Sequence, residues 1–226
     1  MSEKNSSMPE IIIQAVVSLD GRIAFKDNSY IFCNDSGFDK FLQEKETEKH
    51  IFVIGVGNII YNERVKNKRY LSEIKAKKHF AILDSSLRIH LDFEILKNAE
   101  VDEIIIYHHS RNFKKISALK KLGAKVIKID KVSSGLKIRD IIAEISSRDI
   151  KAIIVNSSTK LNSFFIKEKL VDKLHLCYKN ILIGGDNLLF SDLGIIKQND
   201  EINLKIEKVE VVKNGYYLEA TVNYQR

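Results

Sequence analysis

Two turns that follow apolar runs carry groups suited to binding an anion. Gly55-Val56-Gly57 follows Ile51–Ile54, and glycines let the backbone approach a ligand where strands of open α/β sheets end. Asn156-Ser157-Ser158-Thr159 follows Ile153-Ile154-Val155 and precedes a helical pattern. N–H groups and hydroxyls at a helix N-terminus favour phosphate. A plain turn and an ordinary helix N-cap explain the same residues, so both interpretations stay open.

The remaining motifs do not indicate a catalytic nucleophile or a metal site. His108 and His109 are adjacent on a predicted strand, where they would face opposite ways and form a poor metal pair. Gly184-Gly185 ends an apolar run and indicates either a turn or a close approach to a ligand. The sequence lacks H-E-x-x-H, a nucleophile elbow, a P-loop and the zinc-deaminase signature. The residues alone predict an α/β domain with one or two phosphate cradles and no metal.

Repeated βα units are predicted to position these turns. Apolar, β-branched runs recur along the chain, and near-continuous ones such as Ile104-Ile105-Ile106 indicate strands that are covered on both faces. The predicted strands are Ile11–Val17, Ile51–Ile54, Phe80–Leu83, Ile104–Tyr107, Lys125–Ile129 and Lys151–Val155.

Helical periodicity fills the segments between several of these strands. Gly123 stands at a predicted C′ position, and the segment Ser157-Ser158-Thr159 could cap a helix. The predicted apolar stripes are Ile138-Ile141-Ile142-Ile145, Phe113-Ile116-Leu119-Leu122, Leu161-Phe164-Phe165 in a helix over Leu161–Leu170, and Phe38-Phe41-Leu42.

The last part of the chain predicts an antiparallel hairpin. Apolar residues alternate from Ile202 to Ile206 and again, in shifted phase, at Val209 and Val211, so a bulge is expected near Glu207-Lys208. Asn214-Gly215 is a strong hairpin turn signal. We therefore expect one α/β domain over residues 10–226 with a mixed, mostly parallel sheet and a closing hairpin, preceded by a disordered tail over residues 1–9.

Composition narrows the class of protein. The chain has 226 residues, of which 44% are hydrophobic. It contains no apolar stretch of eighteen residues and no secretory signal, so neither a transmembrane helix nor secretion is expected. Cys33 and Cys177 form no C-x-x-C pair, so reduced thiols in a cytoplasmic protein are expected. The net charge of +7 suits an anionic partner such as a phosphorylated metabolite or nucleotide. The charge is spread along the chain, so nucleic acid is not the expected partner and no membrane contact is predicted.

Five short motifs occur in order along the chain. They are Ser18-Leu19-Asp20-Gly21-Arg22-Ile23-Ala24, Gly55-Val56-Gly57, Ile82-Leu83-Asp84-Ser85-Ser86-Leu87-Arg88, Leu170-Val171-Asp172-Lys173-Leu174-His175-Leu176 and Ile181-Leu182-Ile183-Gly184-Gly185. Together with the hairpin, they span about residues 10–225. In this order they resemble the reductase domain of riboflavin biosynthesis, which has a dihydrofolate-reductase-like fold.

The resemblance implies a reaction and a set of site residues. NADPH would give a hydride to the ribosyl C1′ of a phosphoribosylaminopyrimidine, which opens the sugar to a ribityl chain. The implied cofactor residues are Gly55, Gly57, Ser85, Ser86, Arg88, Asn156, Ser157, Ser158 and Thr159, with Ser85, Ser86 and Arg88 near the 2′-phosphate. The implied substrate residues are Ser18, Asp20, Asn34, Asn62 and Arg69, of which Asp20 is also the catalytic candidate. A homodimer is likewise implied, and we expect a separate protein to perform the deamination.

The sequence departs from the family pattern at contact positions. Gln14, Asn58 and Asn62 stand where the family has lysine, threonine and aspartate, and Asn156-Ser157-Ser158 replaces Glu-Gly-Gly. Two hypotheses follow: a working reductase of the riboflavin pathway, and a catalytically silent member that acts as a binding or assembly protein.

Overall fold

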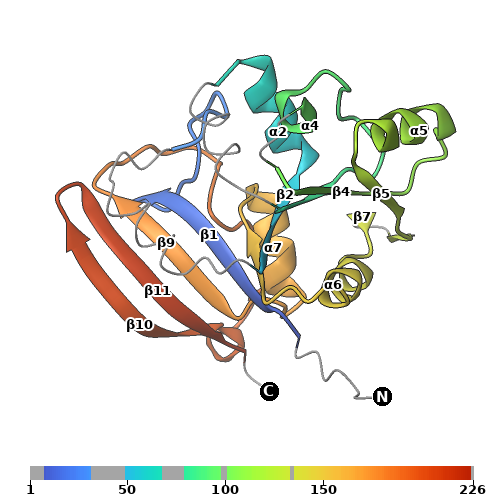
Figure 1. Ribbon diagram of the computed structural model, residues 1–226. Coiled ribbons are helices and arrows are strands. Elements are labelled where there is room, and N and C mark those ends of the chain that lie inside the picture. The colour runs from blue at the N-terminus through green and yellow to red at the C-terminus, as the bar shows by residue number, and fades with distance from the viewer. Residues whose placement is uncertain (1–7, 32–48, 68–78, 98–100, 133–134, 225–226) are drawn as a thin grey trace. The chain divides into compact units, whose positions relative to one another are not determined.

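The computed structural model describes residues 8–31, 49–67, 79–97, 101–132 and 135–224 (Figure 1). Backbone contacts divide the chain into two compact units. We call Met1–Pro9 with Lys49–Lys151 the first unit, and Glu10–Glu48 with Ala152–Arg226 the second unit.

The elements alternate between strands and helices along the chain. The strands are β1 (Glu10–Ser18), β2 (His50–Gly55), β3 (His79–Leu83), β4 (Glu103–His108), β5 (Lys125–Lys128), β6 (Lys131–Val132), β7 (Gly135–Leu136), β8 (Ala152–Val155), β9 (Lys173–Lys179), β10 (Asn203–Val212) and β11 (Gly215–Asn223). The helices are α2 (Val56–Arg64), α4 (Glu94–Lys97), α5 (Phe113–Lys121), α6 (Ile138–Ser146), α7 (Thr159–Lys167) and the 3-10 turn η1 (Gln198–Asp200).

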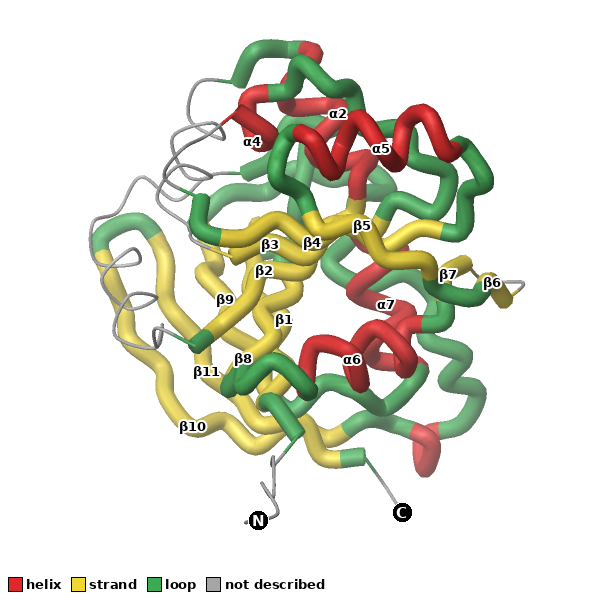
Figure 2. Tube along the Cα trace, turned by 45° about the vertical axis from the view of Figure 1, so that its right-hand side comes forward, coloured by secondary structure: helices red, strands yellow, loops and turns green. Residues whose placement is uncertain are grey.

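The sheet of the first unit is parallel. Its strands lie in the order β2-β3-β4-β5, and Figure 2 shows β3, β4 and β5 side by side. Ile51, Val53 and Ile105 are at most 1% exposed, which fits strands covered on both faces. Helix α6 buries its apolar stripe, and Tyr107 of β4 donates its hydroxyl hydrogen to Glu144 of α6. Because parallel strands end at the same edge of a sheet, the turns that follow β2, β3 and β4 share one edge of this unit.

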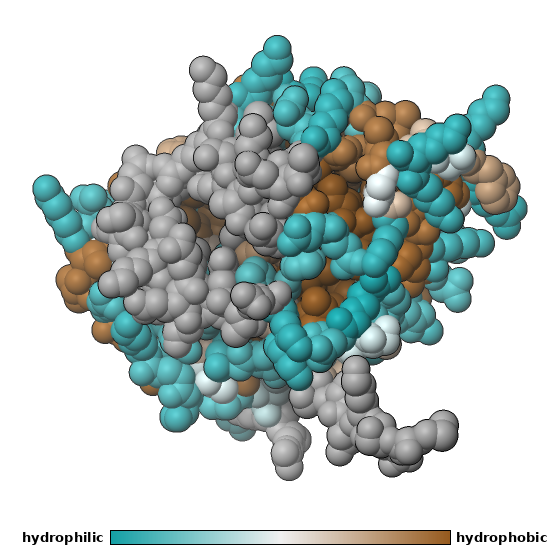
Figure 3. Space-filling model, viewed as in Figure 1, coloured by the Kyte–Doolittle hydropathy of each residue, from teal (hydrophilic) through white to brown (hydrophobic). Residues whose placement is uncertain are grey.

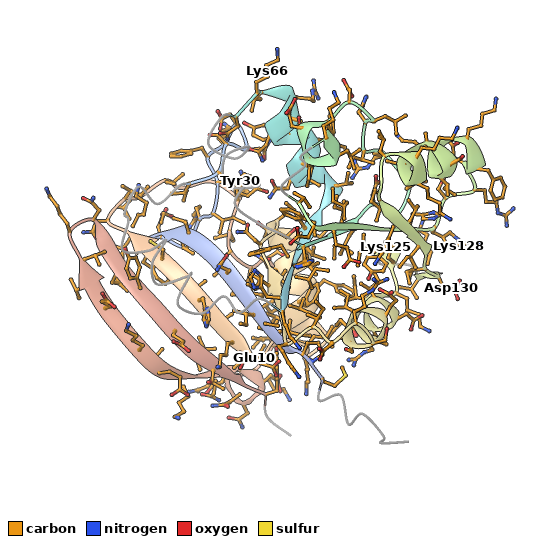
Figure 4. The ribbon with its side chains drawn as sticks, viewed as in Figure 1. Glu10, Tyr30, Lys66, Lys125, Lys128 and Asp130 are labelled. Atoms are coloured by element: carbon orange, nitrogen blue, oxygen red, sulfur yellow. The ribbon has the colours of Figure 1, made fainter. Side chains whose placement is uncertain are left out.

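The sheet of the second unit is mixed. Its strands lie in the order β10-β11-β9-β1-β8, with β1 parallel to β8 and β9, and β11 antiparallel to β9 and β10. Glu10, labelled in Figure 4 at the start of β1, forms an ion pair of 2.8 Å with Lys173 at the start of β9. Ile13, Val17 and Ala220 are fully buried in the core of this unit.

The structure confirms most of the predicted elements. All six predicted strands form, with ends that differ by no more than one residue. The register of β10 against β11 shifts between Ile206 and Lys208, as the bulge prediction requires, and the hairpin turns at Asn214-Gly215. The predicted α/β fold with parallel strands and a closing antiparallel hairpin is therefore confirmed.

Two helix predictions need correction. Helix α5 forms and Gly123 follows it with a positive φ of 90°, but Phe113 is 78% exposed and Leu122 is 43% exposed, so only part of the expected stripe is buried. Helix α7 ends at Lys167 and not at Leu170, because Lys169 takes a left-handed conformation with φ 55°. The helix expected around Phe38 lies outside the described residues.

Candidate functional site

The turn after β2 presents an open helix N-terminus. Gly55 is the N-cap residue of α2, and none of the described side chains caps this helix. The first turn of α2 carries no acidic residue. Apart from the two neighbouring residues and the backbone of α2 itself, no atom of the described part of the chain lies within 4 Å of the position that a Cβ on Gly57 would take. Backbone N–H groups in such surroundings can donate to a phosphate.

The turn after β3 is built by the buried carboxylate of Asp84. This side chain is fully buried and accepts hydrogen bonds of 2.8 Å from the backbone N–H groups of Arg88 and Ile89. Leu87 takes a left-handed φ of 55° and turns its side chain into the core. Aspartate commonly forms such turns, because its carboxylate accepts hydrogen bonds from nearby backbone N–H groups.

This buried scaffold leaves the polar residues of the turn accessible. Ser86 and Arg88 are exposed, and Ser85 is half-buried. The carbonyl of Ser85 accepts a hydrogen bond of 2.9 Å from the N–H of His109, which ties the turn to the end of β4. The three predicted cofactor residues of this turn therefore lie together, with hydroxyls and a guanidinium that suit a phosphate.

Asn62 differs from its expected role beside the substrate. It is fully buried in α2, and its amide nitrogen donates to the carbonyl and the side-chain oxygen of Asn58 at 2.9 and 2.8 Å. Its side-chain oxygen accepts a hydrogen bond of 2.9 Å from Asn67. Because its polar atoms are used inside the protein, Asn62 stabilises the helix and its C-terminal turn and does not present a group to a ligand.

The turn after β8 divides its four predicted cofactor residues into two pairs. Asn156 and Ser158 are exposed, and Ser158 is the N-cap residue of α7, which none of the described side chains caps. Ser157 is only 5% exposed, and the hydroxyl of Thr159 donates to the carbonyl of Leu188. Ser157 is therefore buried, and Thr159 directs its hydroxyl to a loop of the second unit.

Asp20 joins two loops of the second unit. Its carboxylate accepts hydrogen bonds from the hydroxyl of Ser18 at 2.5 Å and from the N–H groups of Gly184 at 2.7 Å and Ile183 at 3.2 Å. Arg22 donates from Nε to the carbonyl of Gly185 at 3.1 Å. Gly184 has a positive φ of 70°, which glycine adopts without strain. Ser18 is itself fully buried, so it holds Asp20 and does not reach a ligand.

These contacts fix the charge of Asp20. The hydrogen bond from Ser18, and then those from the backbone of Gly184 and Ile183, lower the pKa of Asp20 to about 2. Asp20 is therefore ionised at neutral pH. In this state it can accept hydrogen bonds and favour positive charge, but it has no proton to donate.

Three residues named in the sequence analysis have no described structure, and the role of one further residue was not predicted from the sequence. Asn34, Arg69 and Cys33 lie outside the described residues, whereas Cys177 is a buried free thiol. Asp84 organises the Ser85–Arg88 turn, a role that the sequence analysis did not assign. The signal was present, because aspartate at the end of an apolar strand favours a turn.

The described residues show neither a membrane span nor a metal cluster. None of their helices is long and apolar enough to cross a membrane. They contain no group of three or more His, Cys, Asp or Glu side chains placed to hold a metal ion.

Comparisons with known proteins give the family. The family model described as the RibD C-terminal domain matches residues 9–218. The 2,5-diamino-6-ribosylamino-4(3H)-pyrimidinone 5′-phosphate reductase of Aquifex aeolicus is 23% identical over 205 residues, which are 88% of this chain and 89% of that protein. The riboflavin biosynthesis protein RibD of Actinobacillus pleuropneumoniae is 20% identical over 95% of this chain, which spans only 57% of that protein.

Solved structures agree on the fold. RibD of Acinetobacter baumannii superposes with a TM-score of 0.73 at 18% identity and covers 96% of this chain and 58% of that one. Dihydrofolate reductase of Enterococcus faecalis superposes with a TM-score of 0.53 at 12% identity, covering 97% and 98% of the two chains. The dihydrofolate-reductase-like fold is therefore confirmed. With the family match over almost its whole length, the chain belongs to the RibD C-terminal domain family.

Proposed function

We propose that the chain is an NADPH-dependent reductase of riboflavin biosynthesis that converts a ribosylaminopyrimidine phosphate to its ribityl form. The observation that carries this proposal is the family match over residues 9–218. The name of the Aquifex aeolicus relative favours 2,5-diamino-6-ribosylamino-4(3H)-pyrimidinone 5′-phosphate as the substrate. The corresponding aminouracil, 5-amino-6-(5-phosphoribosylamino)uracil, is the second candidate.

The surroundings of the two helix N-termini support a dinucleotide phosphate as ligand. Neither α2 nor α7 has an acidic residue in its first turn, and no described side chain caps either helix. NADPH, when bound, supplies the hydride. In the first unit, we propose Gly55 and Gly57 as cofactor residues. In the second unit, we propose the Asn156–Thr159 turn as a cofactor-binding turn, in which Asn156 and Ser158 offer exposed side chains and the other two residues support the turn.

The turn after β3 supports recognition of the 2′-phosphate. Ser85, Ser86 and Arg88 are held together by Asp84, so their arrangement is set before a ligand arrives. A guanidinium can form two parallel hydrogen bonds with a phosphate, which makes Arg88 the residue that distinguishes NADPH from NADH in this proposal.

Asp20 supports the substrate side of the proposal. Its carboxylate is 24% exposed and ionised, and it fixes the loop at Gly184. A fixed anion favours the positive charge that develops at the C1′–nitrogen bond when the ribosyl ring opens. Asn34 and Arg69 are proposed as further substrate contacts on the family resemblance alone.

Ser157, one of the two serines that replace family glycines in the Asn156–Thr159 turn, does not oppose this proposal. The family has glycine where this chain has Ser157, and an added side chain would obstruct a ligand if it pointed outward. Ser157 is only 5% exposed, so its side chain fills space inside the protein. Ser158 replaces the other glycine and is exposed, and in this proposal its hydroxyl is offered to the ligand.

Steady-state turnover tests the proposal. The purified chain is mixed with NADPH and each of the two pyrimidines, and NADPH oxidation is followed together with the mass of the product. We expect a ribityl product and a lower rate for Arg88→Ala at limiting NADPH. Arg139→Ala, which removes an exposed arginine from α6, is the matched control and should behave like the wild type.

Fluorescence of NADPH separates the two hypotheses. The protein has no tryptophan, so the fluorescence of the bound cofactor can be followed without interference from that residue. NADPH binding without product from either pyrimidine would identify a silent member, and no binding at millimolar NADPH would reject the cofactor assignment.

A further inference from the structure

His109 is held between two strand ends of the first unit. It follows β4, whose neighbours β3 and β5 end at the same edge of the parallel sheet (Figure 2). The N–H group of His109 donates to the carbonyl of Ser85 after β3 at 2.9 Å, and its ring nitrogen Nδ1 lies 3.0 Å from the carbonyl of Ile129 after β5. A carbonyl only accepts hydrogen bonds, so Nδ1 carries the hydrogen and donates it. The backbone and the ring of His109 are therefore both fixed.

This arrangement leaves the second ring nitrogen of His109 as an acceptor. A neutral imidazole has a single N–H, so with its hydrogen on Nδ1 the ring keeps a lone pair on Nε2. His109 is half-buried, and within the described part of the chain no group bonds to Nε2. A fixed acceptor at a partly exposed position can select a ligand that presents a donor hydrogen.

The adjacent His108 differs in each of these respects. It is 2% exposed, and its Nδ1 accepts a hydrogen bond of 3.1 Å from the N–H group of Ser110. Burial lowers the pKa of His108, which favours the neutral ring. In that ring the hydrogen is on Nε2, which is the reverse of His109. Of these two neighbours in the sequence, His109 is the one that offers an acceptor outside the core.

The chemistry of the proposed cofactor defines which donor could reach Nε2. Ser85 is both the partner of His109 and a proposed residue of the 2′-phosphate site, and in NADPH this phosphate and the adenine base are attached to adjacent carbon atoms of one ribose. The base therefore lies next to the Ser85–Arg88 turn when the phosphate is bound there. Phosphate oxygens offer lone pairs and would not bond to a lone pair on Nε2, whereas the 6-amino group of adenine offers donor hydrogens.

The surface near this edge of the first unit combines apolar and polar groups. Figure 3 shows hydrophobic residues beside hydrophilic ones on the right of the molecule, where Figure 1 has β5 and α5. Ser110 is half-buried next to His109, and Ser86 and Arg88 are exposed. A purine has two apolar faces and a polar edge, so mixed surroundings of this kind suit it.

We propose that Nε2 of His109 accepts a hydrogen bond from the 6-amino group of the cofactor's adenine, so that this residue selects an adenine dinucleotide over one with a 6-keto purine. The inference rests on the proposed NADPH dependence and adds recognition of the base to it. His109 acts on cofactor binding, because the base lies at the other end of the dinucleotide from the nicotinamide that transfers the hydride. Loss of the acceptor should therefore raise KM for NADPH and leave kcat unchanged.

Replacement of adenine by hypoxanthine tests the base directly. Reduced nicotinamide hypoxanthine dinucleotide phosphate keeps the phosphates and the nicotinamide, but it has a carbonyl oxygen in place of the 6-amino group. That oxygen would face the lone pair of Nε2. We expect the wild type to bind NADPH about tenfold more tightly than the analogue, because the acceptor loses its donor. Fluorescence of the reduced nicotinamide measures both affinities at about pH 8, where histidine rings are ordinarily neutral.

Two substitutions separate the roles of the two ring nitrogens. In His109→Asn the amide nitrogen takes the place of Nδ1 and can still donate to Ile129, but nothing takes the place of Nε2, so both dinucleotides should bind with equal affinity. In His109→Gln the amide oxygen reaches the position of Nε2, so a preference for NADPH should return. His79→Asn is the matched control. His79 is also half-buried but begins β3 at the opposite edge of the sheet, so this variant should keep the preference of the wild type.

The outcomes distinguish this inference from the proposed function. Equal binding of the two dinucleotides by the wild type overturns the inference while the cofactor assignment stands. A preference for NADPH that survives in His109→Asn shows that another group recognises the base, and it overturns the inference as well. Absence of binding by either dinucleotide rejects the cofactor assignment itself, and the inference falls with it. Circular dichroism reports whether each variant is folded.

Discussion

At the scale of single residues, two carboxylates hold turns of the protein in place by accepting hydrogen bonds from backbone N–H groups. Asp84 shapes the Ser85–Arg88 turn from inside, and Asp20 joins two loops of the second unit. The sequence showed which polar residues follow the strands. It did not show that Asn62 and Ser157 would be buried, or that the hydroxyl of Thr159 would bond to the carbonyl of Leu188. Such contacts depend on neighbours that can be distant along the chain.

Asp84→Asn tests the role of the buried carboxylate. An asparagine can accept with only one side-chain atom, so one of the N–H groups of Arg88 and Ile89 loses its acceptor. The expected loss in free energy of unfolding is about 1–3 kcal/mol, the usual cost of a buried unsatisfied donor. NADPH binding should weaken as well, because the turn is no longer set. Chemical denaturation and cofactor titration measure the two effects.

The exposed Asp92 of the same unit provides the control. Asp92→Asn should change the free energy of unfolding by no more than about 0.5 kcal/mol, which is typical of surface substitutions. Equal effects of the two variants would show that Asp84 has no special role in the turn.

Asp20 gives a prediction for pH. Its pKa is lowered to about 2 in the folded chain, so the folded state binds this proton more weakly than the unfolded state does. The ionised carboxylate therefore stabilises the folded chain fully above the unfolded pKa of 3.8, and this contribution disappears as the pH falls through about 2. The stability difference between wild type and Asp20→Asn, measured by thermal unfolding, should be constant near neutral pH and shrink in that acidic range. A difference that persists unchanged at the acid end would contradict the assignment.

At the scale of elements, periodicity predicted the strands well and the ends and faces of the helices less well. Continuous β-branched runs gave the parallel strands, and the phase slip after Ile206 gave the bulge in β10. Helix α5 shows the limit of this prediction, because Phe113 continues the apolar stripe at the first residue of the helix but is 78% exposed. Whether an apolar stripe is buried depends on what packs against the helix, which the helix sequence does not contain.

Helix α6 is expected to stabilise the first unit through its apolar stripe. Ile145 is fully buried, so Ile145→Ala should lower the free energy of unfolding by about 2–5 kcal/mol through lost burial and a cavity. Ile196→Ala is the matched control, since Ile196 is 88% exposed and should cost almost nothing. Similar losses in both variants, measured by urea denaturation, would contradict the packing of α6.

At the scale of the whole molecule, the sequence predicts one domain over residues 10–226, while backbone contacts group the chain into two compact units. This prediction can be tested by unfolding. A single domain should lose secondary structure and tyrosine fluorescence in one coincident transition. Two separated transitions would show that the units unfold independently. Association between copies of the chain would make the midpoint depend on protein concentration, so the comparison is made at a fixed concentration.

Family membership could be predicted from the sequence, because several of the matching motifs contain residues that determine the conformation of backbone turns. Asp20 with Gly184, and Asp84 with Leu87, each fix a turn whatever the ligand is. The contacts of Asn34 and Arg69 with a substrate depend on the ligand itself, so they stay predictions.

Transfer of an isotopic label tests the central claim most directly. NADPH carrying deuterium at the transferable C4 position is incubated with the chain and 2,5-diamino-6-ribosylamino-4(3H)-pyrimidinone 5′-phosphate, and the product is analysed by mass spectrometry and NMR. We predict one deuterium at C1′ of a ribityl product. A ribityl product without deuterium at C1′, or no product from either pyrimidine despite bound NADPH, would contradict the account.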